Sequence, residues 1–480
     1  MSRIAGVILA AGAATRFGQT KQLLDWHGVP LVAHVADVAS TAGLEPIIVV
    51  LGCEADAVRA ALGHRLTSRE QGQSVQTVIN WHWPAGMSTS VRTGLYTLPE
   101  DIEAAIFLQC DQPLISPALL YAMMERFASD DAGIVHPVAG GRRSTPVLFA
   151  RRFFPELARI IGDQGGRTLI SRYADQVATV PVDDPLILTD VDTPAIYEQL
   201  RALASQRRRL AKIRHAIIDM DGVLWHGEQP MPGLPEFFSF LERHHIAFIL
   251  ATNNSSRSPA QYVAKLARFG VSLLEENVLT SGQATAAYLA SLAPPGAPVY
   301  SIGGEGLRHT LTRHGFVCIS GYAEAPPAQP VYVVVGWDQK LTWKKLEEAT
   351  LLINAGAQLI GTNPDHSYPT ERGPVPGNGA QLAALETATG VSAVIVGKPS
   401  PWMYREALHR MNARPETTVV IGDRLDTDIP GGVRLGMTTV LVLSGITRQA
   451  DVATSPVKPD ILCADISELT ARWSASLERE

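Results

Sequence analysis

Short apolar runs recur along the whole chain, and segments with helical spacing separate them. Strands of a parallel sheet are buried on both faces, so they appear in a sequence as uninterrupted apolar runs. Alternation of such runs with helices is typical of α/β proteins. The sequence therefore predicts an α/β fold with parallel sheets. The clearest strand runs are residues 5–9, 47–51, 104–108, 216–218, 248–251, 331–335, 394–396 and 418–421.

The length of 480 residues allows about three domain-sized units. A helix that begins after Pro194 runs into the basic cluster Arg207-Arg208-Arg209, where we place a linker. Two proline-rich stretches, residues 293–298 and 325–330, predict loops within an inserted module. The expected division is a first domain at 1–205, a linker at 206–212, and a second domain at 213–480 with its core at 213–284 and 391–480 and a cap at 285–390.

Composition excludes several classes of function. Net charge is −6, which argues against a nucleic-acid-binding surface. The four cysteines are far apart and predict neither a disulfide framework nor a zinc site. No apolar run is long enough to span a membrane, and the apolar run at the N-terminus is too short for a signal peptide. We expect a cytoplasmic protein that binds no nucleic acid and no membrane, and a homo-oligomer is compatible with the sequence.

The strand run at residues 5–9 leads directly into a segment rich in glycine and alanine. Small residues there let backbone N–H groups approach phosphate oxygens. Two basic side chains in the same segment supply positive charge for a triphosphate. We therefore predict a nucleotide-binding loop with Ala10, Ala11, Gly12, Arg16, Gly18 and Lys21.

Two acidic side chains later in the first domain complete this signature. Asp111 closely follows the strand run 104–108, and Asp192 lies in the motif Asp190-Val191-Asp192-Thr193-Pro194. Open α/β sheets place ligand-binding residues at the C-terminal ends of strands. Both aspartates are therefore expected to hold a metal ion beside the α-phosphate. Either could instead only cap the helix that follows it.

Residues 1 to about 200 resemble the molybdenum-cofactor nucleotidyltransferase (MobA-like) family, in particular its cytidylyltransferase branch. The resemblance implies a Rossmann-like fold, and Ala10-Ala11-Gly12 implies CTP as the nucleotide. It implies Asn80 and Ser88 as further nucleotide-binding residues and Mg²⁺ as the metal. The chain departs from the family at Arg143-Ser144-Thr145-Pro146, near the expected acceptor. The matching segments are 9–12, 16–18, 21–24, Asn80, 86–95, 111–113, 162–167 and 190–194.

The motif Asp219-Met220-Asp221-Gly222 follows the strand run 216–218 near the middle of the chain. Two carboxylates two residues apart at a strand end point the same way, so we expect Asp219 and Asp221 to share one divalent metal. Asp219 is placed to attack a phosphoryl group, and Asp221 to act as acid and base.

Three further motifs supply what this chemistry needs, each near a strand run. Thr252 and Asn253 are candidate ligands of the phosphoryl oxygens. Lys398 is a candidate cation for the developing charge, and Asp423 and Asp428 are candidate metal ligands. Because these parts occur in order, a solvated turn is a poor explanation of the motif around Asp219.

The chain from about residue 213 to its end resembles haloacid-dehalogenase-like phosphatases of subfamily IIA (NagD-like), which includes pyridoxal-phosphate, phosphoglycolate and nucleotide phosphatases. The resemblance rests on residues 219–225, 252–255, 361–365, 376–379, 397–401 and 422–429. It implies the roles just given for these side chains and an α/β cap that chooses the substrate. Asn363 and Asp365 are the expected cap contacts with substrate.

The leading hypothesis is a bifunctional enzyme that uses Mg²⁺ in both halves. The first half would transfer CMP from CTP, or another NTP, to a molybdopterin-type acceptor. The second half would hydrolyse a phosphorylated small molecule. Two alternatives stay open: an active phosphatase with a first domain that only binds nucleotide, and a sugar-phosphate nucleotidyltransferase fused to a phosphatase of the same pathway.

Overall fold

Two compact units make up the chain, and the boundary between them follows Ser205. The computed structural model describes residues 3–13, 17–66, 75–130, 132–163, 166–325, 331–370 and 373–477. Helix α7 (Pro194–Ala211) passes through the boundary. Residues 206–211 of the predicted linker at 206–212 continue this helix.

The first unit is built on an eight-stranded sheet. Its strands lie in the order β10 (Val177–Pro181), β7 (Ile134–Ala139), β9 (Val147–Ala150), β6 (Ala104–Gln109), β1 (Ile4–Ala10), β4 (Ile47–Leu51) and β5 (Val75–Ile79), and β8 (Arg142–Arg143) pairs with β7. Strand β9 is antiparallel to both β6 and β7, and β8 is antiparallel to β7. The prediction of parallel sheets therefore holds for most of this sheet but not for β8 and β9. A small hairpin, β2 (Asp25–Trp26) with β3 (Val29–Pro30), lies outside the sheet.

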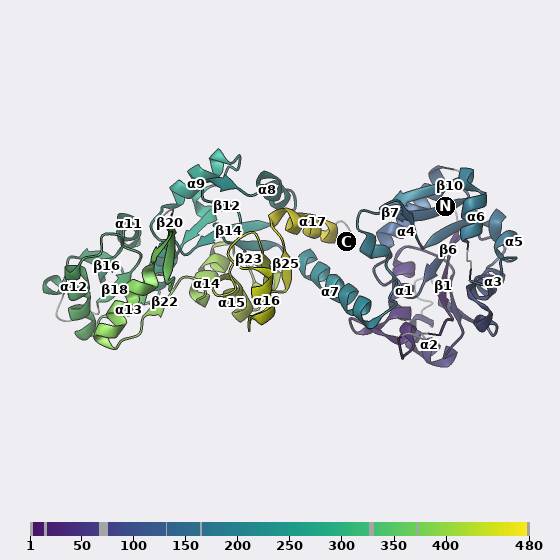
Figure 1. Cartoon of the computed structure of the whole chain (residues 1–480), viewed down its shortest axis with the longest axis horizontal. Coiled ribbons are helices and arrows are strands. Elements are labelled where there is room, and N and C mark those ends of the chain that lie inside the picture. The colour runs from purple at the N-terminus through teal and green to yellow at the C-terminus, as the bar shows by residue number, and fades with distance from the viewer. Residues whose placement is uncertain are drawn as a thin grey trace. The chain divides into compact units, whose positions relative to one another are not determined.

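Helices cover both faces of this sheet (Figure 1). Alternate residues of β1 divide between the faces: Ile4 and Ile8 join one buried cluster, and Ala5 and Val7 join the other. This explains why β1 and β4 are apolar without alternation. Helices α1 (Leu31–Thr41), α2 (Ala55–Leu62), α4 (Pro117–Ser129) and α7 pack on the first face, and α3 (Met87–Thr97), α5 (Phe154–Leu157) and α6 (Arg167–Arg172) on the second.

The core of the second unit is a six-stranded sheet whose paired strands are all parallel. The order is β15 (Val278–Thr280), β14 (Ala247–Thr252), β11 (His215–Ile218), β23 (Thr418–Gly422), β24 (Thr438–Val442) and β25 (Ile461–Cys463). Helices α8 (Leu234–Arg243), α9 (Pro259–Arg268) and α17 (Ile466–Leu477) contribute to one apolar cluster, and α10 (Ser281–Ala290) and α14 (Pro401–Arg410) to another. Helix α11 (Glu305–Arg313), which lies between two strands of the inserted cap, joins the second cluster. Two short helices, α15 (Asp428–Arg434) and α16 (Gln449–Thr454), complete the core, together with the hairpin β12 (Trp225–His226) and β13 (Gln229–Pro230).

A cap with its own five-stranded parallel sheet is inserted into this core. Its strands are β17 (Val317–Ile319), β16 (Pro298–Ile302), β18 (Tyr332–Val335), β19 (Gln358–Gly361) and β22 (Val394–Ile395). The pairing of β22 with β19 corrects the predicted boundary, because residues 394–395 belong to the cap sheet and not to the core. The cap also holds α12 (Trp343–Asn354), α13 (Asn378–Thr389) and the hairpin β20 (Ser367–Thr370) with β21 (Gly373–Pro376).

The cap and the core share apolar packing. One buried cluster contains Ile217 and Leu279 of the core together with Val299, Val334 and Ile360 of the cap. Such a shared cluster restrains the cap over the strand ends of the core. In the part of the chain that the structure describes, no helix combines the length and apolar character that crossing a bilayer requires.

Candidate active sites

Three neighbouring strands of the second unit deliver the predicted catalytic side chains to one edge. Asp219 directly follows β11, Thr252 ends β14, and Asp423 directly follows β23. Because β11 lies between β14 and β23 and runs parallel to both, their C-terminal ends meet. The backbone N–H of Asp219 donates to the carbonyl of Ile421, 2.8 Å away, which fixes the exit of β11 against β23.

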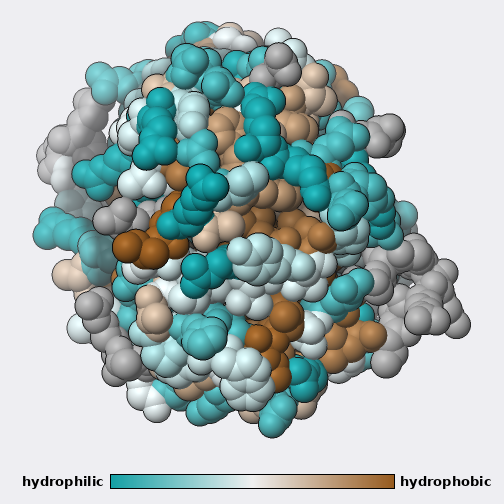
Figure 2. All heavy atoms as spheres, turned by 90° about the vertical axis from the view of Figure 1, so that its right-hand side faces the viewer, coloured by the Kyte–Doolittle hydropathy of each residue, from teal (hydrophilic) through white to brown (hydrophobic). Residues whose placement is uncertain are grey.

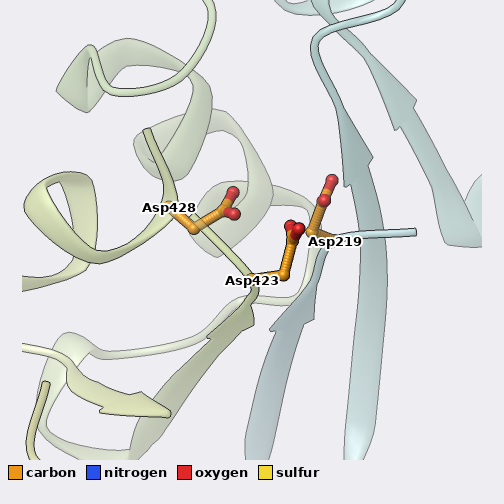
Figure 3. A group of neighbouring side chains, drawn as sticks. All are labelled: Asp219, Asp423 and Asp428. Carbon is orange, nitrogen blue, oxygen red and sulfur yellow. The ribbon is translucent and has the colours of Figure 1, made fainter. Parts of the chain in front are cut away.

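Asp219, Asp423 and Asp428 form a compact group of carboxylates. One oxygen of each lies within 4.8 Å of the others, and Figure 3 shows the three side chains turned toward one another from a strand end, a loop and the start of α15. Asp423 is 1% exposed. Its Oδ2 accepts the N–H of Ile446 at 2.7 Å, while its buried Oδ1 has no hydrogen-bond partner.

This group fits a hard divalent cation. Burial, with the nearby charge of Asp428 next, raises the pKa of Asp423 to about 6, and burial also raises the pKa of Asp219 well above its ordinary value. Oxygen-only donors with an unpartnered buried oxygen are the ligands that Mg²⁺ prefers. Two glycines provide the space that the Asp423 carboxylate occupies. A Cβ on Gly445 would lie 1.9 Å from Oδ2 of Asp423, and a Cβ on Gly222 would lie 2.6 Å from it.

Lys398 is the cation of this site. Its Nζ lies 2.5 Å from Oδ1 of Asp219 and 2.7 Å from Oδ1 of Asp428, and it donates to the carbonyl of Ala251 at 3.1 Å. The residue is 4% exposed. Burial alone would lower the pKa of Lys398, but the two carboxylates outweigh it and raise the pKa above its ordinary value. The ammonium therefore stays charged and partly neutralises the carboxylate group.

Asp221 departs from the predicted metal group. The structure does not place its carboxylate with the other three, although it lines the same cavity. The indole Nε1–H of Trp225 instead donates to Oδ1 of Asp221 at 2.7 Å. The prediction that the side chains of Asp219 and Asp221 share a metal is therefore not met by this geometry, because a local hydrogen bond holds Asp221 elsewhere.

A polar network joins the predicted phosphate ligands to the predicted cap contacts. The side-chain amide of Asn253 donates to Oδ1 of Asp365 at 3.1 Å and to the carbonyl of Lys398 at 3.0 Å. Nδ2 of Asn363 donates to the carbonyl of Asn253 at 2.7 Å. Thr252 is buried, and its hydroxyl accepts the N–H of Asn254 at 3.1 Å. Burial, opposed mainly by Arg424, raises the pKa of Asp365.

These side chains surround a cavity of about 670 Å³ between the core and the cap. Several residues that line this cavity were not predicted from the sequence. Trp337 and Tyr368 of the cap stack with ring centroids 3.9 Å apart, and Tyr368 accepts from Nδ2 of Asn254 at 3.4 Å. Arg257, Lys265 and Arg424 add positive charge. The only signal for Trp337 was its place just after the strand run 331–335, where a site residue is expected.

The first unit has its own cavity, of about 560 Å³, beside the C-terminal ends of β1 and β6. Ala11, Gly12 and Lys21, which were predicted to bind nucleotide, line this cavity together with Asp111, a predicted metal ligand. The carbonyls of Ala10 and Gly12 accept from Nε2 of the buried Gln22, which holds the start of the loop. Gly18 has a positive φ of 72°, and Arg16 lies outside the described residues.

Lys21 brings the two predicted metal ligands of this unit together. Its Nζ lies 3.2 Å from Oδ2 of Asp111 and 2.9 Å from Oδ1 of Asp192. The helix-capping alternative is wrong for both aspartates, because Ser116 caps α4 and the hydroxyl of Thr193 accepts from the N–H of Ile196 at the start of α7.

Asp190 is a further acidic side chain at this edge. Its Oδ1 is buried without a hydrogen-bond partner, and burial, with the charge of Asp111 next, raises its pKa to about 6. The motif that contains Asp192 also contains Asp190, so the signal was present in the sequence, but we assigned the role to Asp192 alone.

Asn80 and Ser88, which were predicted to bind nucleotide, lie beneath the cavity surface. Both are buried, and neither is among the described residues that line the cavity. Nδ2 of Asn80 donates to the hydroxyls of Thr89 and Ser90 at 2.8 and 3.0 Å, so Asn80 supports the first turn of α3. The cavity is lined instead by Trp83, Met87 and Asp163. Met87 and Asp163 belong to the matching segments 86–95 and 162–167, but no binding role was predicted for either of them.

Family models match both units. The model of the MobA-like NTP transferase domain covers residues 6–179, that of haloacid dehalogenase-like hydrolases covers 216–317, and an HAD-hydrolase-like model covers 395–469. These matches agree with the two resemblances seen in the sequence and with the two cavities in the structure.

Individual proteins are similar to about half of the chain. An acid sugar phosphatase of Staphylococcus saprophyticus is 36% identical over 253 residues, which is 53% of this chain and 95% of that protein. The structure of a p-nitrophenyl phosphatase from Archaeoglobus fulgidus is 33% identical with a TM-score of 0.51, over 54% of this chain and 98% of that one. A glycerol phosphate phosphatase of Mycobacterium tuberculosis, solved in complex with calcium, is 35% identical with a TM-score of 0.50, over 54% and 76% of the two chains. This chain belongs to the haloacid dehalogenase-like phosphatases through its second unit, and its first unit is a MobA-like NTP transferase domain.

Proposed function

We propose that the chain is a bifunctional enzyme with two separate phosphate chemistries. The second unit hydrolyses a phosphomonoester through a phosphorylated Asp219. The observation that carries this proposal is the buried group of Asp219, Asp423 and Asp428 with Lys398 in contact with two of its members. The first unit transfers a nucleotidyl group, with CTP as the preferred donor.

The phosphatase reaction needs one nucleophile and one acid. A carboxylate oxygen of Asp219 attacks phosphorus, and the bond from phosphorus to the ester oxygen breaks as Asp221 gives that oxygen its proton. Asp221 then takes a proton from water as the water oxygen attacks the same phosphorus. The bond to Asp219 breaks, inorganic phosphate leaves, and both carboxylates return to their starting states.

Asp219, Asp423 and Asp428 would hold Mg²⁺ in this site. When bound, the ion would offset the negative charge of these three carboxylates and of the phosphoryl group. Lys398 neutralises Asp219. Thr252 lines the same cavity at the end of β14, and we propose that its hydroxyl binds a phosphoryl oxygen. Asn253 is already engaged by Asp365 and Lys398, so we propose that it orients the cap loop as well as the phosphate.

A small phosphorylated metabolite is the proposed substrate of the second unit. Relatives of this part of the chain include an acid sugar phosphatase and a p-nitrophenyl phosphatase. The cavity of about 670 Å³ has stacked aromatic rings on the cap side and positive side chains at its wall, which suits a sugar phosphate.

The first unit is proposed to transfer CMP from CTP to a phosphorylated acceptor. A phosphate oxygen of the acceptor attacks the α-phosphorus of CTP, and the bond to the β-phosphate breaks, which releases pyrophosphate. Lys21 contacts two carboxylates at the cavity edge, and those carboxylates would hold Mg²⁺ there, with Asp190 as a third donor. A molybdopterin-type acceptor is proposed from the family model over residues 6–179.

A sugar 1-phosphate acceptor is the second candidate for the first unit. The fusion of the two units motivates it, because domains joined on one chain often act in the same pathway. A sugar phosphatase as relative of the second unit points the same way.

Product analysis distinguishes these proposals. The purified chain is incubated with Mg²⁺, each of the four NTPs, and either molybdopterin or a panel of sugar 1-phosphates, and pyrophosphate is measured. We expect release with CTP and molybdopterin. Release with a sugar 1-phosphate alone would establish the second candidate. CTP binding without turnover on any acceptor would leave the first unit as a nucleotide-binding domain.

A further inference from the structure

The indole of Trp225 holds the carboxyl group of Asp221. Trp225 is fully buried, and its Nε1–H donates to Oδ1 of Asp221 at 2.7 Å. Trp225 is part of the motif that begins at Asp219, but the chemistry of that motif assigned it no role. The contact is the only hydrogen bond that the described residues make to this carboxylate from another side chain.

A glycine turn brings the indole back to the aspartate. The N–H of Gly222 donates to the carbonyl of Trp225 at 2.9 Å, and the N–H of Leu224 donates to that of Met220 at 2.8 Å. Gly222 has a φ of 86°, and a Cβ on it would lie 2.6 Å from Oδ2 of Asp423. Only glycine fits this turn without strain, so the path of the chain fixes where the side chain of Trp225 begins.

Two neighbours on α9 hold the indole ring in place. Tyr262 stacks on Trp225 with an interplanar angle of 21° and centroids 6.4 Å apart. Nζ of Lys265 lies 4.4 Å from the ring centroid and donates to the carbonyl of Gly227 at 2.5 Å. Lys265 is 4% exposed, so this cation–π contact is largely desolvated, where such contacts are strongest.

We propose that Trp225 is a positioning residue for the acid step of the phosphatase reaction. Because one oxygen of Asp221 accepts from the indole, the other oxygen is the one that carries the proton to the ester oxygen. Lys265 contributes indirectly to the orientation of Asp221, because it holds the indole ring of Trp225 in place. The inference rests on the proposed phosphatase function and adds to it the group that orients Asp221.

The basicity of the leaving group tests the proposal. An alkyl phosphate needs protonation of its leaving oxygen much more than p-nitrophenyl phosphate does, since p-nitrophenolate is a stable anion. A misplaced acid therefore slows the alkyl ester selectively, whereas a general loss of packing slows both esters alike. General acid catalysis contributes roughly 10²–10⁴-fold, and disturbing its orientation should remove part of that.

The experiment compares Trp225→Phe with Trp473→Phe. Trp473 is also fully buried in the second unit and also donates one indole hydrogen bond, to the carbonyl of Leu210 at 3.1 Å. The two variants therefore lose the same atoms. kcat/KM is measured for glycerol 2-phosphate and p-nitrophenyl phosphate with Mg²⁺. We expect Trp225→Phe to lose on the order of tenfold more activity on the alkyl ester than on the aryl ester, and Trp473→Phe to change both by the same factor.

A second variant guards against misfolding of Trp225→Phe. Lys265→Met keeps the indole and most of the lysine stem, and we expect a smaller loss with the same selectivity for the alkyl ester. Equal losses on both esters in Trp225→Phe, or in Lys265→Met when Trp225→Phe does not fold, would overturn this inference alone. A wild-type protein that cleaves neither ester would overturn the proposed function and this inference with it.

Discussion

At the scale of single residues, the phosphatase site concentrates negative charge in a buried place. Three carboxylates lie within 4.8 Å of one another, and Lys398 contacts two of them from a buried position. Burying like charges together is costly unless cations offset them. Lys398 and a bound divalent ion together would do so, which is why the proposed site depends on both.

Replacing Lys398 should disable the site. Lys398→Met removes the ammonium that neutralises Asp219, and we expect kcat on p-nitrophenyl phosphate to fall about 10²–10³-fold, as when a preorganised group that stabilises transition-state charge is lost. Lys345→Met is the matched control, because Lys345 pairs with Asp338 of the cap at 2.6 Å, outside the cavity. Similar losses in both variants would contradict the assigned role of Lys398.

Gly445 is predicted to be essential for metal binding. A Cβ there would lie 1.9 Å from Oδ2 of Asp423, so Gly445→Ala must displace a metal ligand. We expect the Mg²⁺ concentration for half-maximal phosphatase activity to rise at least about tenfold, since displaced metal ligands and their partners typically cost 10–100-fold in affinity. Gly304→Ala meets no atom within 4 Å and should leave that concentration unchanged. An unchanged Mg²⁺ requirement in Gly445→Ala would contradict the site.

At the scale of elements, strand runs were predictable and strand partners were not. The run 47–51 has the same bounds as β4, and the run 248–251 lies at the centre of β14. Both could be predicted because a strand that is buried on both faces is apolar without alternation. The run 394–396 carried the same signal, yet β22 pairs with β19 of the cap and not with the core. Partner choice depends on contacts between distant segments, which an apolar run does not encode. The antiparallel direction of β9 was missed for the same reason.

The site residues followed the same division. Asp219, Thr252 and Asp423 were predictable because each stands at the end of an apolar run, where parallel strands bring ligands together. Trp337 and Tyr368 were not, since their stacking depends on how a cap loop folds back. Asn80 was assigned to the nucleotide, but its amide is used to support α3, and only the structure shows that use.

Asn253 follows β14 and Asn363 follows β19, and a hydrogen bond joins them. Loss of this bond should affect substrate binding more than the free energy of unfolding. Asn363→Ala removes a 2.7 Å hydrogen bond to the carbonyl of Asn253, which still accepts from Ser281 at 2.6 Å. We expect a cost of about 1 kcal/mol in the free energy of unfolding and a several-fold rise in KM for p-nitrophenyl phosphate.

The control for this junction is Thr342→Ala. Thr342 caps α12 through its hydroxyl, so its loss should cost about 1 kcal/mol of stability as well. We expect KM to stay at its wild-type value in this variant. Equal KM values in both variants would show that the hydrogen bond of Asn363 does not position the cap loop for substrate.

At the scale of the whole molecule, the chain joins two units that each have a complete cavity of their own. The boundary follows Ser205, and every described residue that lines the two larger cavities comes from one unit only. No catalytic side chain proposed for one unit is needed in the other. We therefore propose two independent active sites on one chain, with α7 passing from the first unit into the second as a structural connection.

The most direct test of this claim is a crossed pair of variants assayed for both reactions. Asp219→Asn should lose hydrolysis of p-nitrophenyl phosphate while pyrophosphate release from CTP, with the acceptor found active, stays at the wild-type rate. Asp111→Ala should lose pyrophosphate release while hydrolysis stays at its wild-type rate. If either single substitution abolished both activities in a protein that is still folded, the two-site account would be wrong.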